Sequence, residues 1–203
     1  MSTGVSTLAS PPTLVGQLWP SRDETRFAVI RTALLVLAGS LMLTVSAKIS
    51  VPFYPVPMTM QTLVVLLIGA TYGLRLGAAT VAAYLLQGLA GLPVFAGAVA
   101  GPAYMAGPTG GFLVGFLAAA IVTGYLADHG WTKSLVRITA MMAIGHSVIF
   151  AFGLGWLAFL MPVTRAWEVG AAPFVAATFL KTALAVAALQ AAWSFVQRDG
   201  PER

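Results

Sequence analysis

Long apolar stretches alternate along the chain with short segments rich in proline, glycine or charge. These breaks predict six membrane-spanning helices, at approximately Phe27–Lys48, Gln61–Gly73, Leu76–Leu89, Gly111–Ala127, Ser134–Met161 and Pro173–Val196. A helix needs about 20 apolar residues to cross about 30 Å of hydrocarbon. The second and third segments are too short to cross untilted. We therefore expect that they are shielded inside the bundle or that the protein is thinner there.

The spacing of the charges supports a membrane protein. Only 8% of the 203 residues are charged and 59% are hydrophobic, with a mean hydropathy of +0.89. A soluble domain carries roughly 25% charged residues. No Asp, Glu, Lys or Arg occurs over the 52 residues from Leu76 to Ala127, which is room for two crossings joined by a polar connection. The sequence thus predicts an all-α membrane protein with six transmembrane helices.

The basic residues predict the orientation of the helices. Six crossings put both termini on one side, and that side carries eight basic residues: Arg22, Arg26, Arg31, Arg75, Lys133, Arg137, Arg198 and Arg203. The opposite side carries only Lys48 and Arg165. Basic residues concentrate on the cytoplasmic side, so both termini are expected in the cytoplasm. Despite the net charge of +5, the basic residues are too dispersed to form a nucleic-acid-binding face.

The remaining composition sets the predicted domain organisation. Residues 1–21 are rich in Ser, Thr and Pro and lack a basic segment before an apolar one, so they predict a disordered tail and not a cleaved signal. We expect residues 22–198 to form a single six-helix transmembrane domain, the part of the chain that would bind a substrate, and residues 199–203 to form a short tail. The absence of cysteine excludes disulfides and thiolate metal sites.

The two outer connections are chemically distinctive. The first, Val51–Pro57, has three prolines, which favour a stiff extended segment. The second runs from Gly88 to Gly111, is about 24 residues long and carries no charge. A connection of this length is usually functional or disordered, and its apolar and aromatic content argues against disorder. We expect it to form an ordered lid or wall of an outward-facing pocket.

Glycines recur every four residues at Gly69, Gly73 and Gly77, and again at Gly111 and Gly115. This spacing allows helices to approach closely. Tight packing within one bundle is the favoured interpretation, and a subunit interface is the alternative.

Lys181 is the strongest candidate for a functional residue. It lies eight residues into the last predicted helix, about 12 Å along the axis, where a lysine costs about 2.5–3.5 kcal/mol to insert. Neither Ala177 nor Thr178, one turn away, supplies a carboxylate to pair with it. A buried ammonium without a counter-ion predicts an anionic ligand. Snorkelling of the side chain to the membrane interface is the alternative.

Further candidates surround the outer connections. Gln61 can donate and accept hydrogen bonds, either to a ligand or as a bridge between helices. Aromatic residues in the outer half can line an apolar pocket or serve as interfacial belt residues. The candidates for ligand contact, besides Lys181, are Thr178, Gln61, Tyr84, Phe95, Tyr104, Phe112 and Phe53.

An enzyme active site has little support from the sequence. His146 is a lone histidine next to Ser147, and Asp128 with His129 at a helix end is typical of a capped or solvated turn. No HExxH, GxSxG, P-loop or metal-ligand spacing occurs. An intramembrane enzyme using His146 and Ser147 remains an alternative, as does a structural membrane subunit that binds no small molecule.

Three motifs in the connections are distinctive: Val51–Gln61 (VPFYPVPMTMQ), Gly91–Gly97 (GLPVFAG) and Gly107–Phe112 (GPTGGF). In this order they resemble the signature of the BioY family, the biotin-binding substrate-capture (S) components of energy-coupling factor (ECF) transporters. The resemblance implies a six-helix protein of a prokaryotic cytoplasmic membrane that holds biotin near its outer surface. It also implies a transmembrane coupling subunit and ABC-type ATPases as partners, and no cofactor beyond the biotin cargo.

The chain departs from the family at Thr178, where the resemblance implies an acidic residue three positions before the lysine. If the ligand is biotin, we expect Lys181 to neutralise its valerate carboxylate. The ureido group would then bind Gln61, Thr178 or loop backbone. Because Thr178 can retune the pocket, an S component for another small vitamin is an alternative.

Overall fold

The computed structural model describes residues 13–19 and 25–198, which are mostly helical. The helices are α1 (Leu14–Leu18), α2 (Thr25–Lys48), α3 (Gln61–Leu89), α4 (Pro102–Ala106), α5 (Gly110–Asp128), α6 (Leu135–Leu160), α7 (Val163–Gly170) and α8 (Val175–Arg198). Two 3₁₀ turns, η1 (Trp131–Lys133) and η2 (Ala172–Phe174), precede α6 and α8. Five segments are long and apolar enough to span a membrane, namely Arg26–Lys48, Gln61–Leu89, Gly110–Asp128, Leu135–Leu160 and Val163–Val196.

Helix α3 merges two of the predicted spans, but it folds back on itself at Gly73. This residue has φ 79° and ψ −176°, which are not helical angles. The side chains of Gln61 and Tyr84 then meet at 2.6 Å, although a straight helix would separate these residues by about 34 Å. The side chain of Asp128, at the end of α5, accepts a hydrogen bond from the first amide after the bend, that of Leu74, at 3.1 Å. The sequence predicted a capped or solvated turn at the end of α5; the structure shows that the Asp128 side chain caps an amide of another helix, α3.

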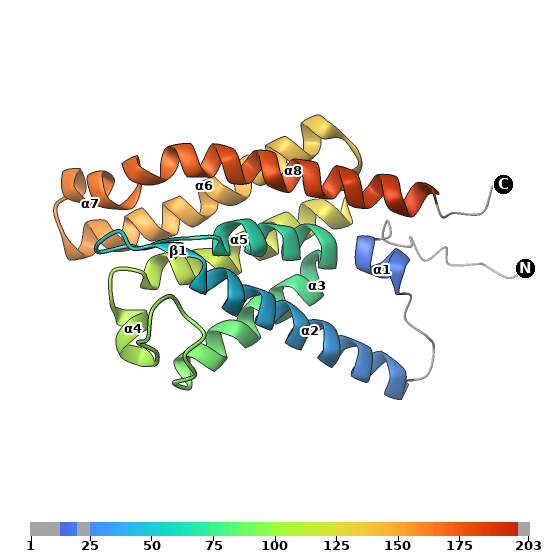
Figure 1. The fold of residues 1–203 in the computed structure, drawn as a ribbon, viewed down its shortest axis with the longest axis horizontal. Helices are drawn as coiled ribbons and strands as arrows, with labels where there is room; N and C mark the ends of the chain where they lie inside the picture. The colour runs from blue at the N-terminus through green and yellow to red at the C-terminus, as the bar shows by residue number, and fades with distance from the viewer. Residues whose placement is uncertain (1–12, 20–24, 199–203) are drawn as a thin grey trace, which may run out of the picture.

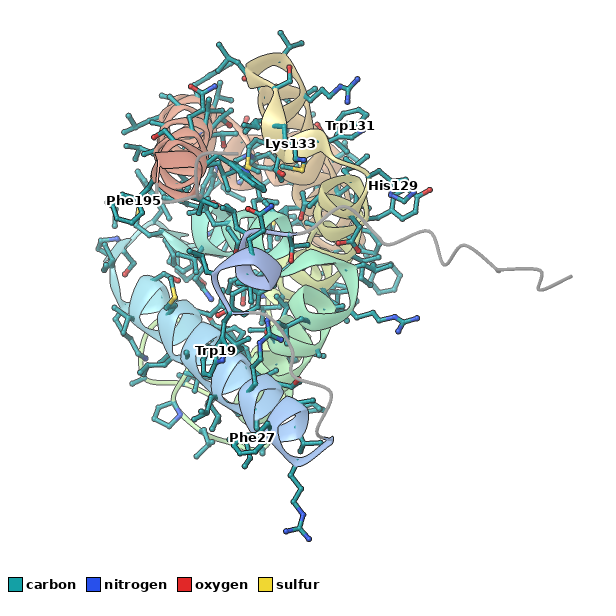
Figure 2. All side chains as sticks on the ribbon, turned by 90° about the vertical axis from the view of Figure 1, so that its right-hand side faces the viewer. Trp19, Phe27, His129, Trp131, Lys133 and Phe195 are labelled. Carbon is teal, nitrogen blue, oxygen red and sulfur yellow. The ribbon has the colours of Figure 1, made fainter. Side chains whose placement is uncertain are left out.

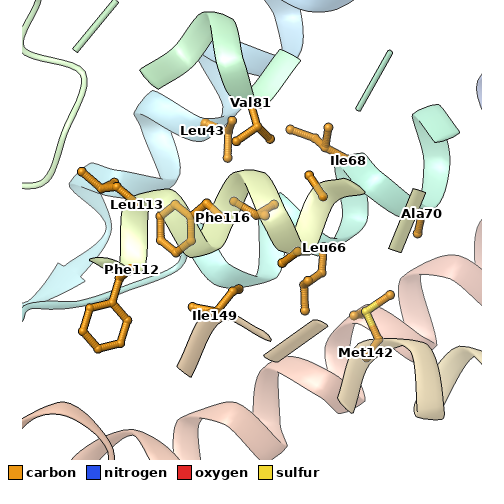
Figure 3. Packing of buried hydrophobic residues seen from close by; sticks show 14 of the residues in the cluster. Leu43, Leu66, Ile68, Ala70, Val81, Phe112, Leu113, Phe116, Met142 and Ile149 are labelled. Carbon is orange, nitrogen blue, oxygen red and sulfur yellow. The ribbon is translucent and has the colours of Figure 1, made fainter. Parts of the chain in front are cut away.

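Helices α3 and α5 form the centre of the bundle. In the most apolar stretch of 18 residues in each helix, 50% of the residues are buried in α3 and 61% in α5, compared with 17% in α2. Figure 1 shows α6 and α8 running side by side, with α5 and α3 between this pair and α2. Figure 3 shows the core between them, where Leu43 of α2, Leu66 of α3, Phe116 of α5 and Ile149 of α6 gather. The two short predicted spans, now the halves of α3, are therefore shielded inside the bundle, as expected.

Glycines allow the close approach of these central helices. A Cβ on Gly69 would meet the Ala120 carbonyl oxygen of α5 at 3.0 Å, and one on Gly115 would meet the Ile149 Cα of α6 at 3.1 Å. A Cβ on Gly77 would lie 3.2 Å from the Cα of Gly69, across the two halves of α3. These contacts confirm packing within one bundle for Gly69, Gly77 and Gly115.

One end of the bundle, here called the loop end, carries both long connections. Strands β1 (Ser50–Val51) and β2 (Met58–Thr59) pair antiparallel and close the proline-rich loop between them, a small exception to the predicted all-α fold. The ammonium of Lys48 donates hydrogen bonds of 2.7 Å to the carbonyl oxygens of Phe95 and Gly97. These bonds and α4 organise the second connection, so the expectation that it is ordered is confirmed.

The opposite end, here called the terminal end, carries α1 and the end of α8. Figure 2 views this end, with Trp19, Trp131 and Lys133 labelled. The side chain of Leu14 is buried, and the Arg31 guanidinium donates to the Val15 carbonyl at 3.3 Å. The segment predicted as a tail thus contains a helical turn, Leu14–Leu18, which packs against α3 near its bend and against α8. The rest of that predicted tail, apart from residues 13 and 19, and the tail 199–203 lie outside the described residues.

Candidate functional site

A pocket at the loop end lies between α3, α5, α6 and α8 and is covered by segments of both connections. It is called the central pocket here. Five of the eight predicted residues line it: Gln61, Tyr104, Phe112, Thr178 and Lys181. The other lining residues are Val56, Pro57, Thr59, Thr62, Ala96, Thr109, Leu113, Phe116, His146, Ile149, Phe150 and Phe174.

The ammonium of Lys181 faces the polar wall of the central pocket. Lys181 lies six residues into α8, about 9 Å along the axis, and its side chain is only 6% exposed. Its Nζ donates to the Thr59 carbonyl at 2.7 Å and to the Thr62 hydroxyl at 3.1 Å. The side chain therefore does not snorkel to the membrane interface, and it connects α8 to the start of α3.

The partners of Lys181 leave its charge uncompensated. Both acceptors are neutral, and an ammonium has three donors. Across residues 13–19 and 25–198, the only ion pair joins Arg165 to Glu168, at 3.1 Å. A buried charge is costly unless it is paired. The pocket thus offers a positive charge and a donor to an anionic ligand.

Gln61 has hydrogen-bond partners within the protein. Its Nε2 donates to the Tyr84 hydroxyl, its Oε1 accepts from the Thr59 hydroxyl at 3.2 Å, and Tyr84 donates on to the Val94 carbonyl at 3.0 Å. The chain of hydrogen bonds links the two halves of α3 to the second connection. Gln61 therefore bridges structural elements, one of the two roles left open by the sequence, while its side chain also borders the pocket.

Three predicted contact residues do not line the central pocket. Tyr84 and Phe95 are fully buried behind it. Their rings pack edge to face with centroids 5.5 Å apart, and the ring of Phe95 stacks on that of Tyr104 with centroids 5.0 Å apart. They support the wall instead of forming it. Phe53 is 43% exposed and borders a neighbouring open cleft. The centroid of its ring lies 6.3 Å from that of Phe174.

Tyr104 contributes a phenol hydroxyl to the pocket wall and lies outside the membrane-spanning helices. Burial raises the pKa of its phenol above the ordinary value of 10.0. The hydroxyl is therefore protonated at neutral pH and can both donate and accept a hydrogen bond.

Four polar residues of the pocket were not among the predicted contact residues: Thr59, Thr62, Thr109 and His146. Thr59 and Thr62 lie on either side of Gln61, where the first connection leads into α3, and both contact the ammonium of Lys181. Because Thr59 and Thr62 lie next to the predicted helix start at Gln61, a residue already proposed as a ligand contact, the sequence could have indicated them as well. His146 was considered only as a packing or catalytic residue, because the sequence does not say which face of α6 meets the pocket.

The geometry does not unite His146 with Ser147. The Ser147 hydroxyl is exposed and donates to the Ala143 carbonyl at 2.9 Å, whereas His146 Nδ1 lies 3.0 Å from the Met142 carbonyl oxygen. A serine nucleophile needs a base within hydrogen-bond distance. This pair therefore lacks the arrangement that an intramembrane hydrolase would use.

The fold and pocket together define a multi-pass membrane protein with a ligand pocket at one end of a helical bundle. The model of the BioY family matches residues 20–198, and the chain belongs to this family.

Relatives support this assignment. The chain is 39% identical over 158 residues to a biotin transporter BioY of Thermotoga maritima, covering 76% of this chain and 91% of the relative. It is 38% identical over 146 residues to a biotin transporter BioY of Rhizobium etli, covering 68% and 78%. A crystal structure of the S-component for biotin from an ECF-type ABC transporter matches with a TM-score of 0.73 and 22% identity, over 87% of this chain and 96% of that one. That structure supports the fold.

Proposed function

We propose that this protein captures biotin and serves as the substrate-specific component of an ECF-type transporter. The observation that carries the proposal is the buried ammonium of Lys181, which lines the pocket and has only neutral partners among the described residues. Biotin carries a carboxylate that complements this charge. Relatives named as biotin transporters support the same ligand.

In the proposed complex the valerate carboxylate of biotin pairs with Lys181. Such charge-assisted hydrogen bonds are roughly twice as strong as neutral ones. The bicyclic ring would pack against apolar side chains of the pocket, among them Phe112, Phe150 and Phe174. Thr178, Gln61 or loop backbone would bind the ureido group. The proline-stiffened loop, which contributes Val56 and Pro57, would cover the ligand at a low ordering cost.

We also propose that transport depends on partner proteins. The sequence contains no P-loop, so ATP would be hydrolysed by ABC-type ATPases acting through a transmembrane coupling subunit. The S-component assignment of the structurally similar protein supports this division of labour. Biotin is cargo in this scheme, and the protein itself uses no cofactor.

Six transmembrane helices with both termini in the cytoplasm complete the proposal. The reversal of α3 at Gly73 supports counting its two halves as separate crossings. The basic residues of the described terminal end are Arg26, Arg31, Arg75, Lys133, Arg137 and Arg198, whereas Lys48 and Arg165 lie towards the loop end. This asymmetry supports a cytoplasmic terminal end.

Titration calorimetry of the purified protein in detergent tests the ligand. We expect saturable, tight binding of biotin, weaker binding of desthiobiotin, and no binding of thiamine or riboflavin. The thiamine and riboflavin titrations are the controls for another vitamin specificity. Binding of thiamine or riboflavin in preference to biotin would contradict the proposal.

The orientation can be tested by labelling, since the chain has no native cysteine. We expect a membrane-impermeant maleimide to label Glu168→Cys on intact cells, because this exposed residue lies at the loop end. Ser134→Cys, exposed at the terminal end, should react only after permeabilisation. Labelling of both positions from the same side would contradict the proposed topology.

A further inference from the structure

His146 is a buried polar residue of the central pocket that the proposed complex does not use. It lies in α6, is 4% exposed, and lines the pocket together with Lys181 and Thr178. Its Nδ1 is 3.0 Å from the Met142 carbonyl oxygen and 3.3 Å from the hydroxyl of Thr182. Thr182 follows Lys181 in α8, so this contact joins α6 to the helix that carries the lysine.

The hydrogen bond at Nδ1 defines the chemistry of the other ring nitrogen. A carbonyl oxygen only accepts hydrogen bonds, so Nδ1 must carry the proton. A second buried cation in a pocket that already holds Lys181 would be costly, which favours the neutral ring. Nε2 then presents a lone pair as an acceptor.

Nε2 has no hydrogen-bond partner in the described part of the chain, although it is buried. A buried polar atom without a partner costs free energy, and such atoms in native proteins call for an explanation. The Nδ1 edge of the ring faces Met142 and Thr182, neither of which lines the pocket. The opposite edge, which carries Nε2, is therefore the part of the ring available to a ligand.

From this geometry we infer that His146 Nε2 accepts a hydrogen bond from an N–H group of the bound ligand. The inference rests on the proposed function, under which the donor is one of the two ureido N–H groups of biotin. His146 would thereby be a specificity-determining residue, selecting ligands that carry an N–H donor in addition to the carboxylate. It supplies an acceptor in a pocket where Thr178 offers only a hydroxyl.

The test is a cycle of protein and ligand changes, measured by calorimetry on the full chain in detergent. The ligands are biotin and its two mono-N-methylated ureido derivatives, each of which lacks one donor. The proteins are wild type, His146→Phe, which keeps a ring without the acceptor, and His146→Gln, which can present an amide oxygen. Ser147→Ala is the matched control, because Ser147 is the exposed neighbour.

We expect one methylated derivative to bind wild type and Ser147→Ala about tenfold more weakly than biotin. His146→Phe should bind biotin about tenfold more weakly than wild type, yet show little further loss with that derivative. His146→Gln should recover part of the biotin affinity that His146→Phe loses. A double-mutant cycle of this kind isolates the interaction between the two changed groups.

Equal methylation penalties in wild type and His146→Phe, for both derivatives, would overturn the inference and leave biotin capture standing. If His146→Phe does not fold, the absence of any penalty in wild type would overturn it equally. Failure of wild type to bind biotin at all would instead defeat the proposed function, and the inference with it.

Discussion

Replacing Lys181 with methionine is expected to weaken biotin binding at least tenfold while the protein stays folded. Methionine retains most of the length and apolar stem of lysine but removes the charge. Hydrogen bonds to charged groups contribute about 1.5–3 kcal/mol, which corresponds to roughly a 10- to 150-fold change in affinity. The effect should be large because the ammonium is buried and only neutral acceptors contact it in the described residues.

Stability should change much less than affinity in this variant. The Thr59 carbonyl and the Thr62 hydroxyl each lose a donor, which destabilises the folded protein. Removing an uncompensated charge from a buried site has the opposite effect. Thermal unfolding in detergent and biotin titration on the same preparations separate the two quantities.

A matched lysine and a matched ligand make the Lys181 experiment specific. Lys133→Met removes a lysine at the terminal end, where its ammonium lies 5.7 Å from the ring of Trp193, and should leave affinity unchanged. Biotin methyl ester, which lacks the carboxylate, should bind wild type weakly and Lys181→Met no worse. Unchanged biotin affinity in Lys181→Met would show that Lys181 does not bind the ligand and only connects α8 to the start of α3.

The bounds of the helices were predictable because each break has a local cause. Proline, glycine or charge ends every apolar segment, and the observed α2, α5 and α6 begin and end within two residues of the predicted spans. The helix α1 was missed because five residues fold only where a partner surface exists, here the bend of α3. Local sequence carries no information about that surface.

Which side chains point into the bundle was less predictable than where the helices begin and end. In a membrane the lipid-exposed surface is as apolar as the core, so hydrophobic periodicity does not reveal the buried face. Phe95 thus packs behind the pocket wall and Tyr104 on it, although both seemed equivalent in the sequence. Lys181 could be predicted as a ligand contact because a charge in an apolar helix needs an explanation. The lone His146 was also noticeable in the sequence, but a neutral histidine is as compatible with helix packing as with a ligand contact.

Replacing Gly73 with alanine is expected to cause the largest loss of stability among single substitutions proposed here. The backbone at Gly73, with φ 79° and ψ −176°, lies in a region essentially restricted to glycine. A Cβ there would collide with the carboxylate of Asp128, which caps the Leu74 amide after the bend. Backbone strain costs about 1–3 kcal/mol and a lost cap about 1 kcal/mol more.

The combined loss predicts a fall in melting temperature of roughly 5–15 °C for a chain of this size. Biotin affinity should fall as well, because the bend brings Gln61 of one half of α3 to Tyr84 of the other, beside the pocket. Gly155→Ala is the matched control, since a Cβ there meets nothing within 4 Å and its φ is ordinary. A melting temperature for Gly73→Ala equal to that of Gly155→Ala would show that α3 tolerates a side chain at its reversal, and the structural basis for treating its halves as two crossings would be lost.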